Sequence, residues 1–134
     1  MQNRIVARFV DGRVLKGTTA DFLPAKPAFH LVPSPQSGTA IAVMEVKVSD
    51  LKALFFVKDF SGDPAYDEVK DFAPGTPPHG RRLQVTFRDG ETLVGTTTGY
   101  QPDRTGFFLI PADPQSNNDR CFIVAAAVKA VRFL

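Results

Sequence analysis

The sequence has no tryptophan, a single cysteine, and no apolar run of the ~20 residues that a membrane-spanning helix needs. One cysteine, Cys121, excludes an internal disulfide and is consistent with a reducing compartment. The first residues, MQNRIVARF, lack the apolar segment and the small-residue cleavage site of a secretory signal. We therefore expect a cytoplasmic protein with no membrane partner.

Residues suited to catalysis or metal binding are also scarce. The two histidines, His30 and His79, are far apart, and together with Cys121 they give no zinc-binding spacing. Asp11 and Asp89 each precede a glycine, so turn formation explains both. The sequence contains no phosphate-cradling glycine loop. These absences predict a protein that is not an enzyme and that needs neither a metal nor a cofactor.

The charge is small overall but unevenly distributed. The net charge of +2 does not by itself indicate a nucleic-acid or membrane partner. Residues 1–60 carry eight Lys/Arg against five Asp/Glu, and residues 80–134 carry seven against five. Residues 61–79 carry one against four. Two mildly basic units therefore flank a short acidic segment.

The sequence contains an internal repeat. The phrase FVDGRVLKGTT near the start returns 78 residues later as FRDGETLVGTT. Residues 4–33 align with residues 82–111 without a gap, and LKALFFV later corresponds to VKAVRFL at an offset of 77 residues. We therefore predict two copies of one unit, residues 1–60 and residues 80–134. Between them, residues 61–79 form an acidic, Pro/Gly-rich connector with a candidate short helix at DPAYDEVKDF.

Each copy has the pattern of five short strands. The clearest alternation is RLQVTF, where Leu83, Val85 and Phe87 share one face. An Asp-Gly hairpin follows, and a three-residue turn with a left-handed glycine and a G1 bulge would turn the next repeated leucine toward the core. The remaining expected strands are VLKGTTADF, AFHLVP, AVMEVKV and LKALFFV in the first copy, and TLVGTTTGY, GFFLIP, CFIVA and VKAVRFL in the second.

Two details of the strands predict strong bending. Gly17 and Gly95 lie in the middle of the second strand of each copy, where a side chain would obstruct a tight coil. The fourth and fifth strands are joined by links that suit a single 3₁₀ turn. We predict an all-β fold of two tandem five-stranded SH3/Sm-like small barrels packed as a pseudo-dimer. The alternative is a β-sandwich in which the two copies exchange strands.

The pattern V-x-F-x-D-G-x-x-L-x-G, followed by a strand–turn–strand pair, resembles the first motif of the Sm/LSm family, which includes bacterial Hfq. That resemblance implies a small barrel that binds RNA. The family's second motif places Arg-Gly or Lys-His at the last turn, whereas this chain has VSDL and AAAV there, which disfavours nucleic acid as the partner. The tandem arrangement also resembles an uncharacterised bacterial repeat found alone or joined to signalling domains.

The candidate binding residues are those at which the two copies differ. Val6 and Val10 are apolar on the outward face of the first strand, where the second copy has Gln84 and Arg88. They indicate a contact, either between the two copies or with another protein.

Two loops carry the other candidates. Lys26 and Arg104 follow a shared proline beside the aromatic residues Phe22 and Tyr100, an arrangement able to stack on a base or hold a peptide unless the ring turns inward. The loop DPQSNNDR supplies three more polar candidates, Asn117, Asn118 and Arg120, or else forms a structured turn.

These observations favour a non-enzymatic adaptor that binds a protein partner in bacterial cytoplasmic signalling. Short exposed barrel edges can accept a strand from a partner or from a second copy of the chain, so a homo-oligomer is also a candidate state. The alternative function is binding of RNA or single-stranded nucleic acid through the loops that hold Lys26 and Arg104.

Overall fold

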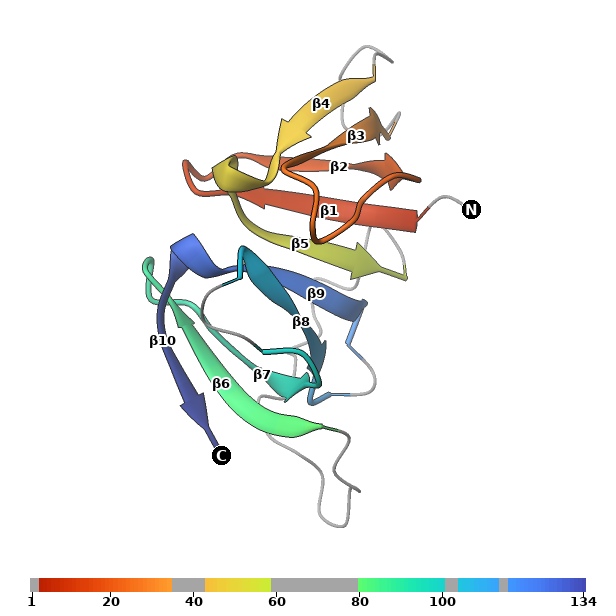
Figure 1. Ribbon diagram of the computed structural model, residues 1–134. Coiled ribbons are helices and arrows are strands. Elements are labelled where there is room, and N and C mark those ends of the chain that lie inside the picture. The colour runs from red at the N-terminus through yellow and green to blue at the C-terminus, as the bar shows by residue number, and fades with distance from the viewer. Residues whose placement is uncertain (1–2, 35–42, 59–79, 101–103, 114–115) are drawn as a thin grey trace.

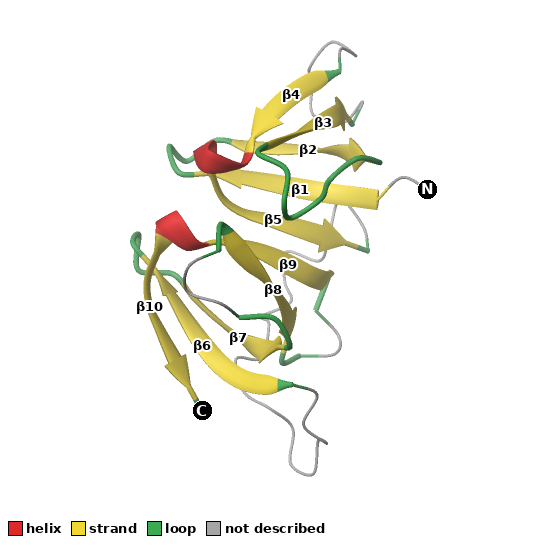
Figure 2. Ribbon diagram, in the orientation of Figure 1, coloured by secondary structure: helices red, strands yellow, loops and turns green. Residues whose placement is uncertain are grey.

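The computed structural model describes residues 3–34, 43–58, 80–100, 104–113 and 116–134. Every regular element in this part of the chain is a β-strand or a single 3₁₀ turn (Figures 1 and 2). The predicted connector, residues 61–79, lies outside the described residues, and so does its candidate helix. No helix in the described part is long and apolar enough to cross a membrane.

The described residues form two sets of five strands, which we call the first half (residues 3–58) and the second half (residues 80–134). The first half contains β1 (Asn3–Phe9), β2 (Val14–Thr19), β3 (Ala28–Pro33), β4 (Met44–Lys47), the 3₁₀ turn η2 (Val48–Asp50) and β5 (Leu51–Val57). The second half contains β6 (Arg81–Phe87), β7 (Thr92–Thr97), β8 (Gly106–Pro111), β9 (Asn118–Val124), the 3₁₀ turn η3 (Ala125–Ala127) and β10 (Val128–Phe133).

The strand registers of the two halves correspond. In the first half Gly17 lies opposite Pro33, and in the second half Gly95 lies opposite Pro111. The expected hairpin turn is confirmed, because Gly12 and Gly90 have φ values of 95° and 94°. The following leucines point inward, Leu15 against the first core and Leu93 within the second. The 3₁₀ links between the fourth and fifth strands are also confirmed.

All ten strands of the described part of the chain belong to one open antiparallel sheet. Their order is β10-β6-β7-β8-β9-β5-β1-β2-β3-β4, so the two halves join where β5 pairs with β9 (Figure 1). The prediction of an all-β fold is confirmed, but two separate closed barrels are not what the ladder shows. The alternative of strands exchanged between the copies is not shown either, because the five strands of each half pair with one another in the same order, fifth-first-second-third-fourth, and only β5 and β9 pair across the halves.

The physical reason for the joint lies in β5. All seven of its residues are buried, so β5 needs cover on both faces. Leu54 and Phe56 face the first core, whereas Ala53, Phe55 and Val57 face the second. In return, β9 places Phe122 and Val124 in the first core. Each core is therefore completed by a strand of the other half, a relationship that a repeat pattern alone does not reveal.

Candidate functional site

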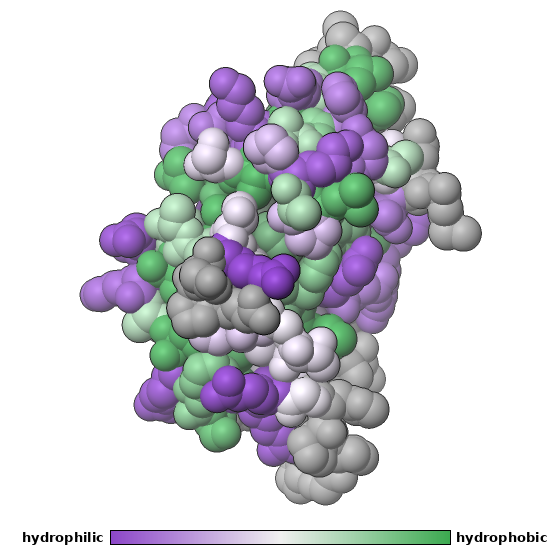
Figure 3. Space-filling model, viewed as in Figure 1, coloured by the Kyte–Doolittle hydropathy of each residue, from purple (hydrophilic) through white to green (hydrophobic). Residues whose placement is uncertain are grey.

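A cleft lies between the two halves. Figure 3 shows one face of the molecule, on which hydrophobic residues form small groups among hydrophilic ones. The cleft has a volume of ≈ 550 Å³. We call it the inter-half cleft and define it by its lining residues: Leu23, Pro24, Ala25, Thr98, Gly99, Arg104, Thr105, Gly106, Phe107, Phe108 and Phe122.

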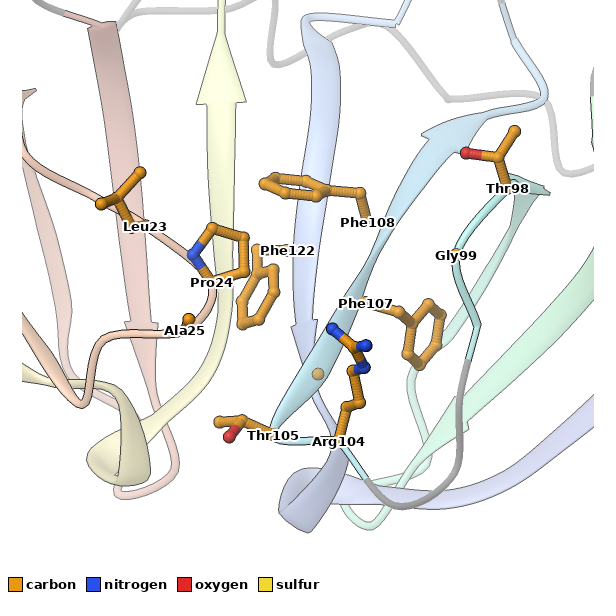
Figure 4. A pocket seen from close by; sticks show the side chains of 11 residues that line it. Leu23, Pro24, Ala25, Thr98, Gly99, Arg104, Thr105, Phe107, Phe108 and Phe122 are labelled. Carbon is orange, nitrogen blue, oxygen red and sulfur yellow. The ribbon is translucent and has the colours of Figure 1, made fainter.

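The walls of the cleft come from two corresponding loops (Figure 4). Residues 23–25 approach from the first half, and residues 98–99 and 104–105 approach from the second. In the sequence these loops read ADFLPAKP and TGYQPDRT, and their prolines are the only identity between them. Two equivalent loops thus form two chemically different walls.

The floor of the cleft is aromatic. Phe108 of β8 and Phe122 of β9 lie edge to face, with ring centroids 5.2 Å apart. Phe22 of the first half packs on both, with its centroid 5.1 Å from that of Phe122 and 6.3 Å from that of Phe108. Edge-to-face packing of this kind holds rings in defined positions. The floor is therefore a rigid apolar surface built from both halves.

A hydrogen-bond network fixes the first-half wall. Asp21 accepts hydrogen bonds from the His30 backbone N–H (2.9 Å) and pairs with His30 Nδ1 (2.6 Å). These bonds to His30 lower the pKa of the Asp21 carboxyl to about 2. Thr19 donates its hydroxyl to the His30 carbonyl (2.9 Å). Asp21 thus holds the start of the loop against β3 and positions Leu23 and Pro24.

Cationic side chains lie in and near the cleft. Arg104 is the one charged side chain among its described lining residues, and Figure 4 shows its guanidinium between Phe107 and the first-half wall. Arg120 lies over two rings, 4.3 Å from the Phe56 centroid and 4.8 Å from the Phe108 centroid. Both distances suit a cation–π contact.

Four of the sequence-predicted residues, Val6, Val10, Lys26 and Arg104, fall into three places. Val6 packs against the second core, between the halves, whereas Val10 is 63% exposed beside the β1–β2 turn. Arg104 lines the cleft, and Lys26 is exposed next to it, its backbone N–H bonded to the Leu23 carbonyl. The structure therefore does not bring these candidates together into one site.

The rings beside the two basic residues turn inward. Phe22 packs in the aromatic floor, and Tyr100 packs on Phe107 and Phe133 at centroid distances of 4.9 and 5.5 Å. Neither ring is fully exposed beside its basic neighbour, because each is partly buried against a core.

The prediction of a loop at DPQSNNDR is wrong for its last residues. Asn118 lies opposite Val57 and Arg120 lies opposite Phe56, so both belong to β9. Asn117 immediately precedes the strand, and its carbonyl accepts a hydrogen bond from the Lys58 N–H (2.9 Å). The strand extends into a polar sequence because β5 offers it a backbone partner from the other half.

Sequence reasoning did not identify Phe108 and Phe122 as a shared floor. The available signal is the place where β8 reads GFFLIP while β3 reads AFHLVP. His30 is exposed in the first half, whereas Phe108 at the corresponding position is covered by Phe22.

The model of one family matches the chain over residues 1–134, and its description is a family of unknown function (DUF6982). The chain belongs to the DUF6982 family. No curated protein and no solved structure matches it. The family assignment covers both halves and carries no activity with it.

Metal binding and thiol chemistry have little support in the described residues of this DUF6982 protein. No group of three or more His, Cys, Asp and Glu residues is placed to hold a metal within that part of the chain. Cys121 is fully buried in the second core, where a thiol serves as a packing group. The inter-half cleft combines a hollow shape, an aromatic floor and a charged side chain, and we take it as the candidate site.

Proposed function

We propose that this protein is a non-enzymatic interaction module that binds a segment of a partner protein in the inter-half cleft. The observation that carries the proposal is the cleft itself, an apolar groove whose two walls are equivalent loops with different side chains. Ligand grooves in proteins are typically apolar with a few placed polar groups. An adaptor role in signalling extends the same proposal.

The chemistry of the groove favours a particular kind of segment. Leu23 is 56% exposed and the floor is aromatic, so apolar side chains of the partner find contacts on both sides. Arg104 supplies positive charge within the groove. A carboxylate of the partner would pair with this guanidinium through charge-assisted hydrogen bonds. We therefore infer a segment that combines apolar residues with an acidic one.

A displayed library of random peptides tests the proposal on the full chain. Selected peptides should share an apolar residue next to Asp or Glu, and Arg104→Glu or Leu23→Asp should weaken their binding at least about tenfold, the loss expected from one charge-assisted contact or one apolar anchor. The matched controls are Lys47→Glu and Val43→Asp, equivalent changes at exposed positions on and beside β4, away from the cleft. These controls should leave binding unchanged.

A second experiment separates this proposal from nucleic-acid binding. We expect fluorescence anisotropy to detect no binding of a single-stranded oligonucleotide, even at low ionic strength. Low ionic strength is the most sensitive condition for this test, because phosphate contacts are strongest there. Oligonucleotide binding that Lys26→Glu and Arg104→Glu both abolish would replace the peptide proposal. Peptides whose binding is equally insensitive to the cleft variants and to the controls would also contradict it.

A further inference from the structure

The joint between the halves is a pairing of two particular strands, the fifth strand of the first half with the fourth strand of the second. Across it Phe55 lies opposite Cys121 and Leu54 lies opposite Phe122. Phe55 packs in the second core, and Phe122 and Val124 pack in the first. Apolar side chains thus cross the joint in both directions.

The two ends of the sheet are formed by the counterparts of these same strands. Among the described strands, β10 pairs only with β6, as β5 would pair only with β1 without the joint. At the other end, β4 pairs with β3 and with no other described strand. Within the described part of the chain, a fifth strand and a fourth strand therefore each have one edge without a strand partner. Two copies of this chain have the backbone edges to repeat the joint head to tail.

The side chains at these two edges differ from those of the joint at the positions that cross it. Phe55 lies opposite Val6, and Arg132 lies opposite Gln84, the counterpart of Val6 in the second half. Arg132 therefore occupies on β10 the position that Phe55 occupies on β5. Glu45 lies opposite His30 as Phe122 lies opposite Phe108, so Glu45 takes the place of Phe122. Lys47 likewise takes the place of Val124. All three charged residues are exposed.

We propose that β4 and β10 are edges able to pair head to tail between copies of this chain, and that Glu45, Lys47 and Arg132 prevent this pairing in the wild-type protein. In a repeated joint Arg132 would enter the first core of the next chain beside Met44 and Val46, and Glu45 would meet Val131 and Phe133. Burying charges against apolar side chains without a partner is strongly unfavourable. Charges that point inward from an edge are a known means of preventing edge-to-edge association.

The proposal is independent of the cleft. Head-to-tail contact is heterologous, so without the three charges it would propagate from chain to chain. The charges therefore limit the sheet to its ten strands and keep the protein a monomer that presents one inter-half cleft.

Two complementary variants of the full chain test this. Variant one carries Glu45→Phe and Lys47→Val, which restore the joint residues on β4, and variant two carries Arg132→Phe, which restores them on β10. Each retains one blocked edge. Analytical ultracentrifugation should show wild type and each variant alone as monomers, and the equimolar mixture as a dimer of twice the mass. A chain with all three changes should form longer assemblies at increasing concentration.

A second set of variants guards against misfolding or nonspecific adhesion. Glu45→Gln, Lys47→Gln and Arg132→Gln remove the charges without adding apolar surface, and the chain with all three should associate more strongly than wild type. Circular dichroism establishes that each variant is folded. The proposal is overturned if folded variants one and two remain monomers when mixed, if either associates as strongly alone as in the mixture, or if wild type already associates through these edges.

Discussion

Phe55 of β5 lies opposite Cys121 of β9, and its ring is buried in the core of the half to which it does not belong. The guanidinium of Arg8 lies 5.7 Å from the Phe55 centroid, so a residue of β1 covers the ring as well. The two halves therefore share β5, whose residues are all buried, and the buried C-terminal end of β9. A substitution at this joint therefore alters the packing of both cores. We expect the described strands to unfold as one cooperative unit.

We predict that Phe55→Ala lowers the free energy of unfolding by about 3–5 kcal/mol, the usual cost of truncating a buried phenylalanine. The transition followed by circular dichroism in urea should stay single, and amide signals of both halves should disappear together. Arg132→Ala is the matched control, because Arg132 occupies the corresponding ladder position on β10 and is exposed. Its effect should stay within about 0.5 kcal/mol. Loss of second-half signals alone would contradict the shared-core interpretation.

Much of the fold follows from local sequence signals. The alternation in RLQVTF and the Asp-Gly turns predict the hairpins, and the observed β3 and β8 coincide with the predicted AFHLVP and GFFLIP. These features depend on neighbouring residues, so a single sequence contains the information. The left-handed glycines at positions 12 and 90 follow from the same local geometry.

The joint and the cleft depend on contacts between distant residues, which local patterns do not encode. LKALFFV is apolar at nearly every position, a pattern typical of a strand covered on both faces, but it does not identify the covering strand. Asn118 and Arg120 have the composition of a loop and become a strand only because β5 pairs with them. The cleft floor arises in the same way, since Phe22 and Phe122 belong to different halves.

The glycine in the second strand of each half offers a second prediction. A Cβ at Gly95 would lie 2.1 Å from the Ile110 carbonyl oxygen, so the backbone of β8 passes where a side chain would be. Gly95→Ala should destabilise the protein by about 1–3 kcal/mol through overpacking. Gly99→Ala is the control, because nothing lies within 4 Å of the added carbon. Thermal unfolding of both variants checks this, and equal melting temperatures would show that β7 and β8 can separate without cost.

An ion-pair cluster at the joint predicts how stability depends on pH. Lys52 of β5 is 8% exposed, and its ammonium pairs with Asp89 (2.7 Å) and Glu91 of the β6–β7 turn. Arg8 also contacts Glu91 at 3.1 Å. The hydrogen bond from Lys52 is the main cause that lowers the pKa of Asp89. For Glu91, burial raises the pKa, but the Lys52 hydrogen bond and the two cationic charges outweigh it, so the pKa is lowered overall.

The sign of the effect follows from these directions. A carboxyl whose pKa is lower in the folded than in the unfolded state stabilises the fold above its unfolded pKa, about 4 for Asp and Glu. That stability is lost as the pH falls through the folded pKa. We expect the free energy of unfolding of Lys52→Met to fall less steeply than that of wild type as the pH is lowered. The two proteins should therefore differ less in stability at low pH than at pH 7.

Lys129 provides the control for this prediction. It is the counterpart of Lys52 in the second half, at the second position of the fifth strand, but it is exposed on β10. Lys129→Met should preserve the wild-type pH profile. Urea denaturation at a series of pH values below 7 measures the free energy of unfolding for all three proteins. If the free energies of unfolding of Lys52→Met and wild type fall in parallel as the pH falls, Lys52 does not set the pKa values of Asp89 and Glu91. The ion pairs between the halves would then make no pH-dependent contribution to stability.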